Sequence, residues 1–77
     1  MERIPVANSS QILSIGYDPS ILRLEIEFKP FAGQTSSSVY IYDNVAAETY
    51  TELMRAPSKG SYFQKYIKGN YVFKKVA

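Results

Sequence analysis

The chain of 77 residues contains no cysteine and no histidine. Without cysteine, a disulfide framework and a thiolate metal site are both excluded. Without histidine, the commonest general base and the commonest imidazole metal ligand are missing, and so is every catalytic triad built on Ser-His or Cys-His. A small domain free of disulfides fits a reducing cytosol at least as well as secretion, so the absence of cysteine does not by itself decide the compartment.

Long apolar runs are also missing. No stretch approaches the roughly 20 consecutive apolar residues that a membrane helix needs. The N-terminal MERIPVANSS has no apolar core of the signal-peptide kind. We therefore expect a soluble, cytoplasmic protein with no membrane partner. A chain of this length makes one small domain, which buries only about 60% of the surface that its unfolded form exposes.

Acidic residues are missing from the last third of the chain. Residues 1–54 carry three basic and seven acidic side chains, a net charge of −4, whereas residues 55–77 carry six basic side chains and no acidic one, a net charge of +6. A basic segment of this kind suits an anionic partner. It also fits lysines that do no more than solvate the surfaces of helices and strands.

Alternation of apolar and polar residues predicts an antiparallel sheet. Residues 11–17 and 21–29 read as a hairpin around the turn Asp18-Pro19-Ser20. In the second of these strands, four apolar side chains are expected to face the core: Leu22, Leu24, Ile26 and Phe28. Charged side chains occupy the alternate positions, so the opposite face of this strand is expected to be wet.

Residues 39–42, Val-Tyr-Ile-Tyr, predict a third strand whose register the sequence leaves open. Either Val39 and Ile41 or Tyr40 and Tyr42 face the core, because side chains alternate across a sheet. The two tyrosines therefore either pack in the core or present a surface to a partner.

Helical periodicity follows the third strand. A first helix is expected from about Ala46, with Asp43 and Asn44 at its entry, and it should end before Pro57. A second short helix over residues 58–70 is expected to be capped by Ser58 and closed by Gly69. Residues 71–75 form a last strand or an extended arm. The predicted fold class is α+β: a small antiparallel sheet of three or four strands, in the order β-β-β-α-α-β, with two short helices packed on one face.

Several motifs occur in an order that is familiar from one family. They are Asn8-Ser9-Ser10, Ile15-Gly16-Tyr17-Asp18, Tyr40-Ile41-Tyr42, Val45 with Tyr50 and Leu53, Ala56-x-Ser58-x-Gly60-x-Tyr62-Phe63-x-x-x-Ile67, and Tyr71. Together they resemble the KTSC domain, a module named for its place at the C-terminus of some lysyl-tRNA synthetases and also found alone in small bacterial and phage proteins. The resemblance implies a single domain over residues 1–77 with a core from about 8 to 71. The loop over residues 31–38 is longer than is usual in the family, and Ala46 stands where the family tends to have proline.

The synthetase context of the family implies RNA binding, and the residues offer a basic and aromatic surface for it. Backbone amides near Lys59 and Gly60 would seat an anion at a helix start, and Lys65 and Lys68 would share a helix face. Tyrosines interleaved with these lysines could stack on bases. The predicted nucleic-acid-binding residues are Tyr40, Tyr42, Lys59, Gly60, Tyr62, Lys65 and Lys68.

Catalysis is not expected. Glu25 and Glu27 share a strand face but alternate with basic residues, and no phosphate loop or metal-ligand cluster occurs in the sequence. We expect no cofactor, no metal and no small-molecule substrate. The alternative to RNA or another polyanion is a protein partner, a larger enzyme contacted by Tyr40 and Tyr42 as aromatic anchors.

Overall fold

A computed structural model describes residues 2–7 and 9–77. Met1 lies outside the described residues, and so does Asn8, the first residue of the motifs that resemble the KTSC domain. The strands are β1 (Arg3–Pro5), β2 (Ile12–Asp18), β3 (Arg23–Phe28), β4 (Ser38–Tyr42) and β5 (Phe73–Lys75). The helical elements are α1 (Ala47–Arg55), α2 (Lys59–Tyr62) and the π-helix η1 (Phe63–Ile67).

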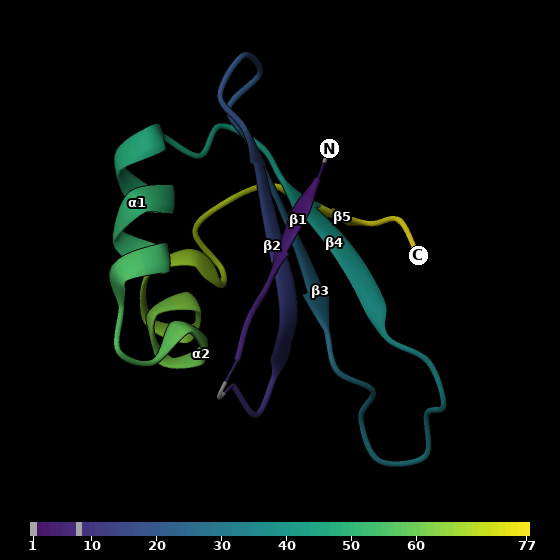
Figure 1. Ribbon diagram of the computed structural model, residues 1–77. Coiled ribbons are helices and arrows are strands. Elements are labelled where there is room, and N and C mark those ends of the chain that lie inside the picture. Colours follow the sequence, from purple (N-terminus) through teal and green to yellow (C-terminus); the bar gives the residue numbers. More distant parts are fainter. Residues whose placement is uncertain (1, 8) are drawn as a thin grey trace.

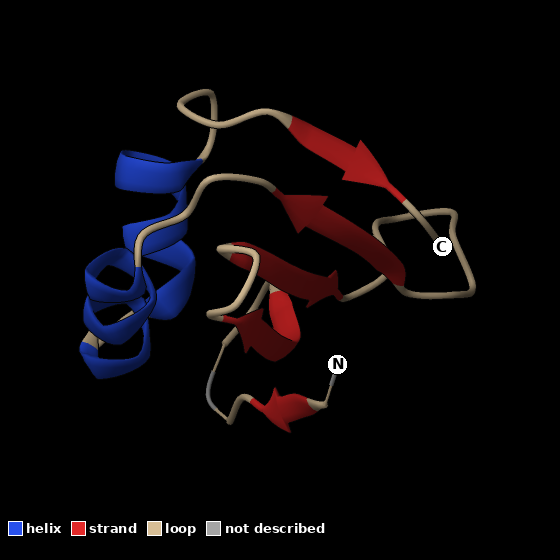
Figure 2. Ribbon diagram, turned by 90° about the horizontal axis from the view of Figure 1, so that it is seen from above, coloured by secondary structure: helices blue, strands red, loops and turns tan. Residues whose placement is uncertain are grey.

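The five strands form one antiparallel sheet in the order β1-β2-β3-β4-β5. The helices lie together on one face of this sheet (Figure 1). Seen from above, they form a layer beside the strands, with β1 and β5 at opposite edges (Figure 2). This arrangement confirms the predicted α+β class and the packing of helices on one face.

The predicted count of three or four strands is wrong, because the N-terminal segment adds β1. Ile4 pairs with Ile15, and Arg3 pairs with Gly16. Three residues are too few to show an alternating pattern, so no local pattern predicts this strand. Pro5 is tolerated there because an edge strand leaves one side of its backbone unpaired.

The hairpin between β2 and β3 has a longer turn than expected. β3 begins at Arg23 rather than at Ile21, and Leu22 adopts a positive φ of 53°. The backbone carbonyl of Leu22 accepts a hydrogen bond of 2.9 Å from the amide of Val45. The expectation that Leu22 faces the core is therefore wrong, because this residue is 41% exposed.

A β-bulge in β2 sets which side chains enter the core. Ile12 pairs with Phe28, but Ser14 pairs with Glu27, so Leu13 is an extra residue on β2. The bulge lets Ile12 and Ile15, three positions apart, both lie buried on the helix side. Ser14 consequently faces the opposite side of the sheet.

The register of β4 turns both tyrosines toward the helices. Tyr42 lies opposite Leu24 and Tyr40 lies opposite Ile26, and residues directly opposite each other share a face. Tyr42 is buried, whereas Tyr40 is half-buried. Three fully buried residues from the second half of the chain complete the hydrophobic core on the helix side of the sheet: Val45, Leu53 and Ile67.

Helix α1 confirms the first predicted helix, but its entry differs from the expectation. Its cap is Ala46, which has no side-chain cap hydrogen bond. Asp43 instead bonds to Arg23, and Asn44 has a positive φ of 60° in the turn. The expected capping role of Asp43 and Asn44 is therefore wrong.

The second predicted helix is split into α2 and η1. Ser58 caps it as expected, since its hydroxyl accepts a hydrogen bond from the amide of Ser61. The amide of Lys68 donates to the carbonyl of Phe63 at 2.8 Å, a five-residue spacing that makes the last turn π-helical. Gly69 follows with a φ of +82° and turns the chain back toward the sheet.

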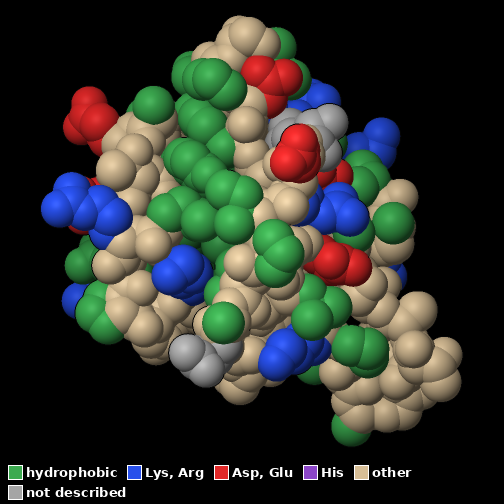
Figure 3. Space-filling view, viewed as in Figure 1, with side chains coloured by type: hydrophobic (Ala, Val, Ile, Leu, Met, Phe, Trp, Pro, Cys, Tyr) green, Lys and Arg blue, Asp and Glu red, His purple; other side chains and the backbone are tan. Residues whose placement is uncertain are grey.

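Hydrophobic side chains are not confined to the interior. Figure 3 shows a hydrophobic band running between the helices and the strands at the β1 edge. Tyr17 and Tyr50 are half-buried and stack with ring centroids 4.7 Å apart, and the Tyr17 hydroxyl donates to the Val45 carbonyl.

No helix in residues 2–7 and 9–77 is long and apolar enough to cross a membrane.

Candidate nucleic-acid interface

A groove of about 530 Å³ lies between η1 and the strands β3, β4 and β5. Phe28, Tyr40, Tyr42 and Phe73 contribute aromatic rings from the sheet, and Phe63 contributes one from η1. We call this feature the aromatic groove. Its remaining lining consists of Ser10, Gln11, Lys29, Pro30, Phe31, Ser38, Gln64, Lys68 and Gly69.

The rings of the aromatic groove contact one another in a continuous chain. Phe63 packs edge-on against Phe28 at 5.2 Å and against Tyr42 at 5.6 Å between ring centroids. Phe73 in turn lies 5.9 Å from both Tyr40 and Tyr42. Edge-to-face and tilted contacts of this length stabilise aromatic clusters, so the groove has a preformed shape.

The groove stays open because the helical layer ends before the sheet does. η1 stops at Ile67, and the turn at Gly69 returns the chain to pair β5 with the outer edge of β4. Phe73 is therefore carried onto the sheet beyond the helices and remains 56% exposed. An exposed phenylalanine beside a half-buried tyrosine offers ring faces to a ligand.

The charge at the aromatic groove is positive. Lys29 and Lys68 line it, and no acidic side chain does so within the described part of the chain. Lys75 lies opposite Tyr40 in the β4–β5 ladder and therefore on the same face. Burial, and secondarily the neighbouring Tyr40, raises the pKa of Tyr42 to about 12, so this phenol stays neutral at physiological pH.

Three of the predicted binding residues come together in the aromatic groove: Tyr40, Tyr42 and Lys68. The other four, Lys59, Gly60, Tyr62 and Lys65, do not line it. The ammonium of Lys59 lies 3.5 Å from the carbonyl oxygen of Ala56. Lys65 lies over the ring of Tyr66, 5.2 Å from its centroid, outside the groove.

The expected anion seat at Lys59 and Gly60 has little room. The side chains of Gln11 and Ser9 lie against Gly60, where a Cβ atom would stand 3.5 Å from the Gln11 Oε1 atom. α2 has only four residues, and the Ser58 hydroxyl already accepts from one of its first amides. Tyr62 packs against Tyr66 at 4.7 Å, and burial raises the pKa of its hydroxyl.

Sequence reasoning did not assign Phe28, Phe63 or Phe73 to a site. The alternating pattern placed Phe28 in the core, and it is in fact half-buried at the end of β3, where the helical cover stops. Only the pairing of β5 with β4 brings Phe73 beside the tyrosines, and no local pattern indicates that pairing.

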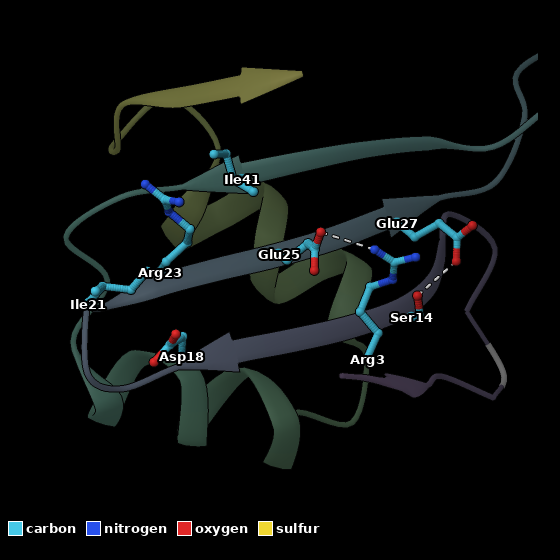
Figure 4. Close-up of a pocket in the computed structure, with 8 residues that line it drawn as sticks. All are labelled: Arg3, Ser14, Asp18, Ile21, Arg23, Glu25, Glu27 and Ile41. Carbon is cyan, nitrogen blue, oxygen red and sulfur yellow. Dashed lines mark hydrogen bonds and ion pairs between the residues drawn. The ribbon is translucent and has the colours of Figure 1, made fainter. Parts of the chain in front are cut away.

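The opposite face of the sheet, which we call the charged face, forms a hollow of about 680 Å³ (Figure 4). It is lined by Arg3, Ser14, Asp18, Ile21, Arg23, Glu25, Glu27 and Ile41.

Two ion pairs engage side chains of the charged face. Arg3 reaches Glu25 at 3.1 Å, and the strand between them carries Gly16 at that register, which has no side chain to obstruct the contact. Arg23 reaches Asp43 at 3.0 Å.

Glu27, also on the charged face, is held by hydroxyl groups. Ser37 donates to its Oε2 atom at 2.6 Å and Ser14 to its Oε1 atom at 2.8 Å. These two hydrogen bonds hold the pKa of Glu27 below its ordinary value, although burial acts in the opposite direction.

Comparison with known proteins identifies the family. The family model of the KTSC domain matches residues 8–71. A crystal structure of a KTSC domain protein from Yersinia pestis is similar to 99% of this chain and 97% of its own, with a TM-score of 0.85 and 41% identity.

Relatives of two sizes carry the same domain. A lysine–tRNA ligase from Nostoc sp. is 37% identical over 68 residues, which are 88% of this chain but 11% of the ligase. An uncharacterized protein from Stutzerimonas stutzeri is 35% identical over 68 residues, which are 86% of that protein. The domain thus occurs both inside a tRNA ligase and as nearly the whole of a small protein. By its sequence and by its fold, this chain belongs to the KTSC domain family.

Proposed function

We propose that the domain is a non-catalytic accessory module that binds single-stranded RNA in the aromatic groove. One observation carries the proposal: exposed aromatic rings and lysines line the same groove, and none of its described lining residues is acidic. Single-stranded nucleic acid is recognised by that combination, because bases stack on the rings and lysines attract the phosphates.

The rings suit unpaired bases. Phe73 and Tyr40 lie 5.9 Å apart between centroids on neighbouring strands, and both retain exposed surface. A base held in a duplex has both of its faces covered, so only an unstacked base can reach these rings. Stacking of this kind contributes about 1–3 kcal/mol per base.

The lysines around the groove supply a modest electrostatic contribution. Lys29 and Lys68 line the groove and Lys75 shares its face, whereas Lys59 and Lys65 lie outside the lining. On single strands, each phosphate contact changes the slope of log K against log salt by about 0.7. We therefore expect a slope of log K against log salt that corresponds to roughly two to three lysine–phosphate contacts. Contacts from all the lysines of the basic segment would give a steeper slope.

The relatives support RNA over other polyanions. A domain similar to this chain occupies about a tenth of a lysine–tRNA ligase, a protein whose name states a tRNA substrate. An accessory RNA-binding module fits that setting, since the matched part is far too small to be the whole ligase.

Fluorescence anisotropy at low salt tests the proposal, with a labelled single-stranded RNA of ten mixed nucleotides, the matching duplex and the same strand as DNA. The single-stranded RNA should bind more tightly than the duplex. Phe73→Ala should weaken that binding about 5- to 150-fold, the equivalent of one lost stack. Val72→Ala is the matched control, because Val72 is 74% exposed and does not line the groove.

The outcomes are separable. Equal binding of the RNA and DNA strands would retain single-strand recognition and reject a preference for RNA. Failure of both strands to bind, or equal affinity of Phe73→Ala and the parent, would reject the groove as a nucleic-acid site. The alternative predicted from the sequence, a protein partner, would then be the remaining use for these aromatic rings.

A further inference from the structure

We infer that the aromatic groove distinguishes bases by their polar edge and favours uracil and guanine over cytosine and adenine at one position. This inference rests on the proposed function, since it concerns the ligand of that same groove. It comes from four polar side chains at one end of the groove that mostly donate hydrogen bonds: Gln11, Lys29, Gln64 and Lys68.

These four side chains come from three places that meet at the groove: the start of β2, the end of β3 and the end of η1. The amide of Lys29 donates to the carbonyl of Gln11 at 2.8 Å, which joins the start of β2 to the end of β3. Gln64 and Lys68 are four residues apart along η1 and its end, a spacing that puts them on one side of a helical turn. The two pairs meet where the Gln64 Nε2 atom donates to the Gln11 Oε1 atom at 3.2 Å.

That contact leaves the end of the groove rich in donors. The carbonyl oxygen of Gln11 already accepts from Gln64, so the Gln11 amide is left with its two N–H groups. Lys68 adds an ammonium with three donors, and Lys29 adds another, one of whose donors binds the Ser9 carbonyl. The main acceptor among the four is the Oε1 atom of Gln64.

The backbone at Gln11 is held in place, and its exposed side chain contacts Gln64. The Ser9 hydroxyl accepts hydrogen bonds from the backbone amides of Gln11 and Ile12, at 3.3 and 3.0 Å. The Gln11 amide group also lies against Gly60 of α2, where a Cβ atom would make an ordinary van der Waals contact at 3.5 Å. A donor held in place discriminates between ligands better than a freely rotating one, because less entropy is lost on binding.

Bases differ at the position that such donors would meet. Uracil and guanine present a carbonyl oxygen, O4 or O6, where cytosine and adenine present an amino group. A donor that faces the amino group of cytosine has no partner, whereas the same donor binds uracil O4. Since uracil and cytosine have nearly the same ring size, their comparison separates edge recognition from stacking.

The test uses the full chain, anisotropy at pH 8, and ten-nucleotide oligo(U) and oligo(C) as probes. The parent should bind oligo(U) at least about fivefold more tightly than oligo(C), the lower end of discrimination by a well-placed base contact. Gln11→Met keeps the length of the side chain and removes its donors, so the ratio should fall to about twofold or less with little change for oligo(C). Thr51→Val, at an exposed site on α1, is the control and should keep the parent's ratio.

Each result decides a separate point. Equal affinity of the parent for oligo(U) and oligo(C), with Phe73→Ala still weakening both, would overturn this inference and leave the proposed function intact. A preference for oligo(U) that survives in Gln11→Met would overturn the role of Gln11. No binding of either probe would remove the inference together with the proposed function.

Discussion

The two faces of one sheet use their polar side chains in opposite ways. On the charged face, Arg3 and Glu25 pair with each other and Glu27 accepts from two hydroxyl groups. In the aromatic groove, Lys29 and Lys68 lie among aromatic rings with no acidic side chain in the described lining.

The difference shows that charge alone does not mark an interaction surface. Charges that already compensate one another within the fold attract a ligand weakly, whereas uncompensated lysines beside exposed rings retain their attraction for phosphates. Strand β3 serves both faces, because Phe28 lines the groove and Glu27 lines the charged face.

Truncation of the shared core should have the largest effect. Leu24 is fully buried beneath the helices, so Leu24→Ala should lower the free energy of unfolding by about 2–5 kcal/mol. Leu22→Ala is the matched control and should cost less than about 1 kcal/mol, because Leu22 is exposed in the hairpin turn. Urea denaturation measures both, and similar losses in the two variants would contradict the assigned strand face.

The second prediction compares one cation from each face. Lys68→Gln should weaken binding of single-stranded RNA and reduce the slope of log K against log salt by about 0.7. Arg23→Gln, on the charged face, should leave both quantities unchanged, because Arg23 is engaged by Asp43. Anisotropy titrations at several salt concentrations measure this. Equal effects of the two substitutions would show that binding follows net charge and not the groove.

A pH dependence is expected on the charged face. The pKa of Glu27 is lowered in the folded protein by Ser37 and Ser14, so the ionised form is the one that folding favours. Its contribution to stability is present above the unfolded pKa of about 4.3 and is lost as the pH falls through the lower folded value. Urea denaturation from pH 7 to pH 2.5 should therefore show a steeper acid loss for the parent than for Glu27→Gln. Parallel curves would contradict this account of Glu27.

The smallest effect is expected from the Arg3–Glu25 ion pair. The Arg3 side chain is 32% exposed and that of Glu25 is 15% exposed, so solvent screens part of their attraction. A double-mutant cycle with Arg3→Ala and Glu25→Ala should give a coupling energy of about 0.2–1 kcal/mol. A coupling well above that range would show that the pair anchors β1 more strongly than its exposure implies.

Much of the fold follows from local patterns. Strict alternation of apolar and charged residues predicts β3, and apolar residues spaced three and four positions apart predict α1. Ser58, whose hydroxyl can cap a helix, predicts the start of α2. β1 and the bulge at Leu13 were not predicted, since the first is too short for a pattern and the second breaks the alternation. The register of β4 depends on its partners in β3, which lie outside any local window.

The sequence predicts fewer of the residues that line the aromatic groove than of the elements of the fold. Residue type and spacing predict Tyr40, Tyr42 and Lys68 as site residues, and all three line the groove. Lys59 and Lys65 have the same residue type as Lys68, but their side chains contact the Ala56 carbonyl and the Tyr66 ring instead. Which lysine reaches the groove depends on how far η1 extends over the sheet.

The most direct test of the central claim is a two-dimensional ¹H–¹⁵N NMR titration of the full chain with single-stranded RNA. The account predicts that amide shifts concentrate around the aromatic groove, at Phe28, Tyr40, Lys68 and Phe73. Amides of the charged face at Ser14, Arg23 and Glu25 should move little. Shifts centred on the charged face, or no shifts at RNA concentrations that saturate binding by anisotropy, would contradict the account.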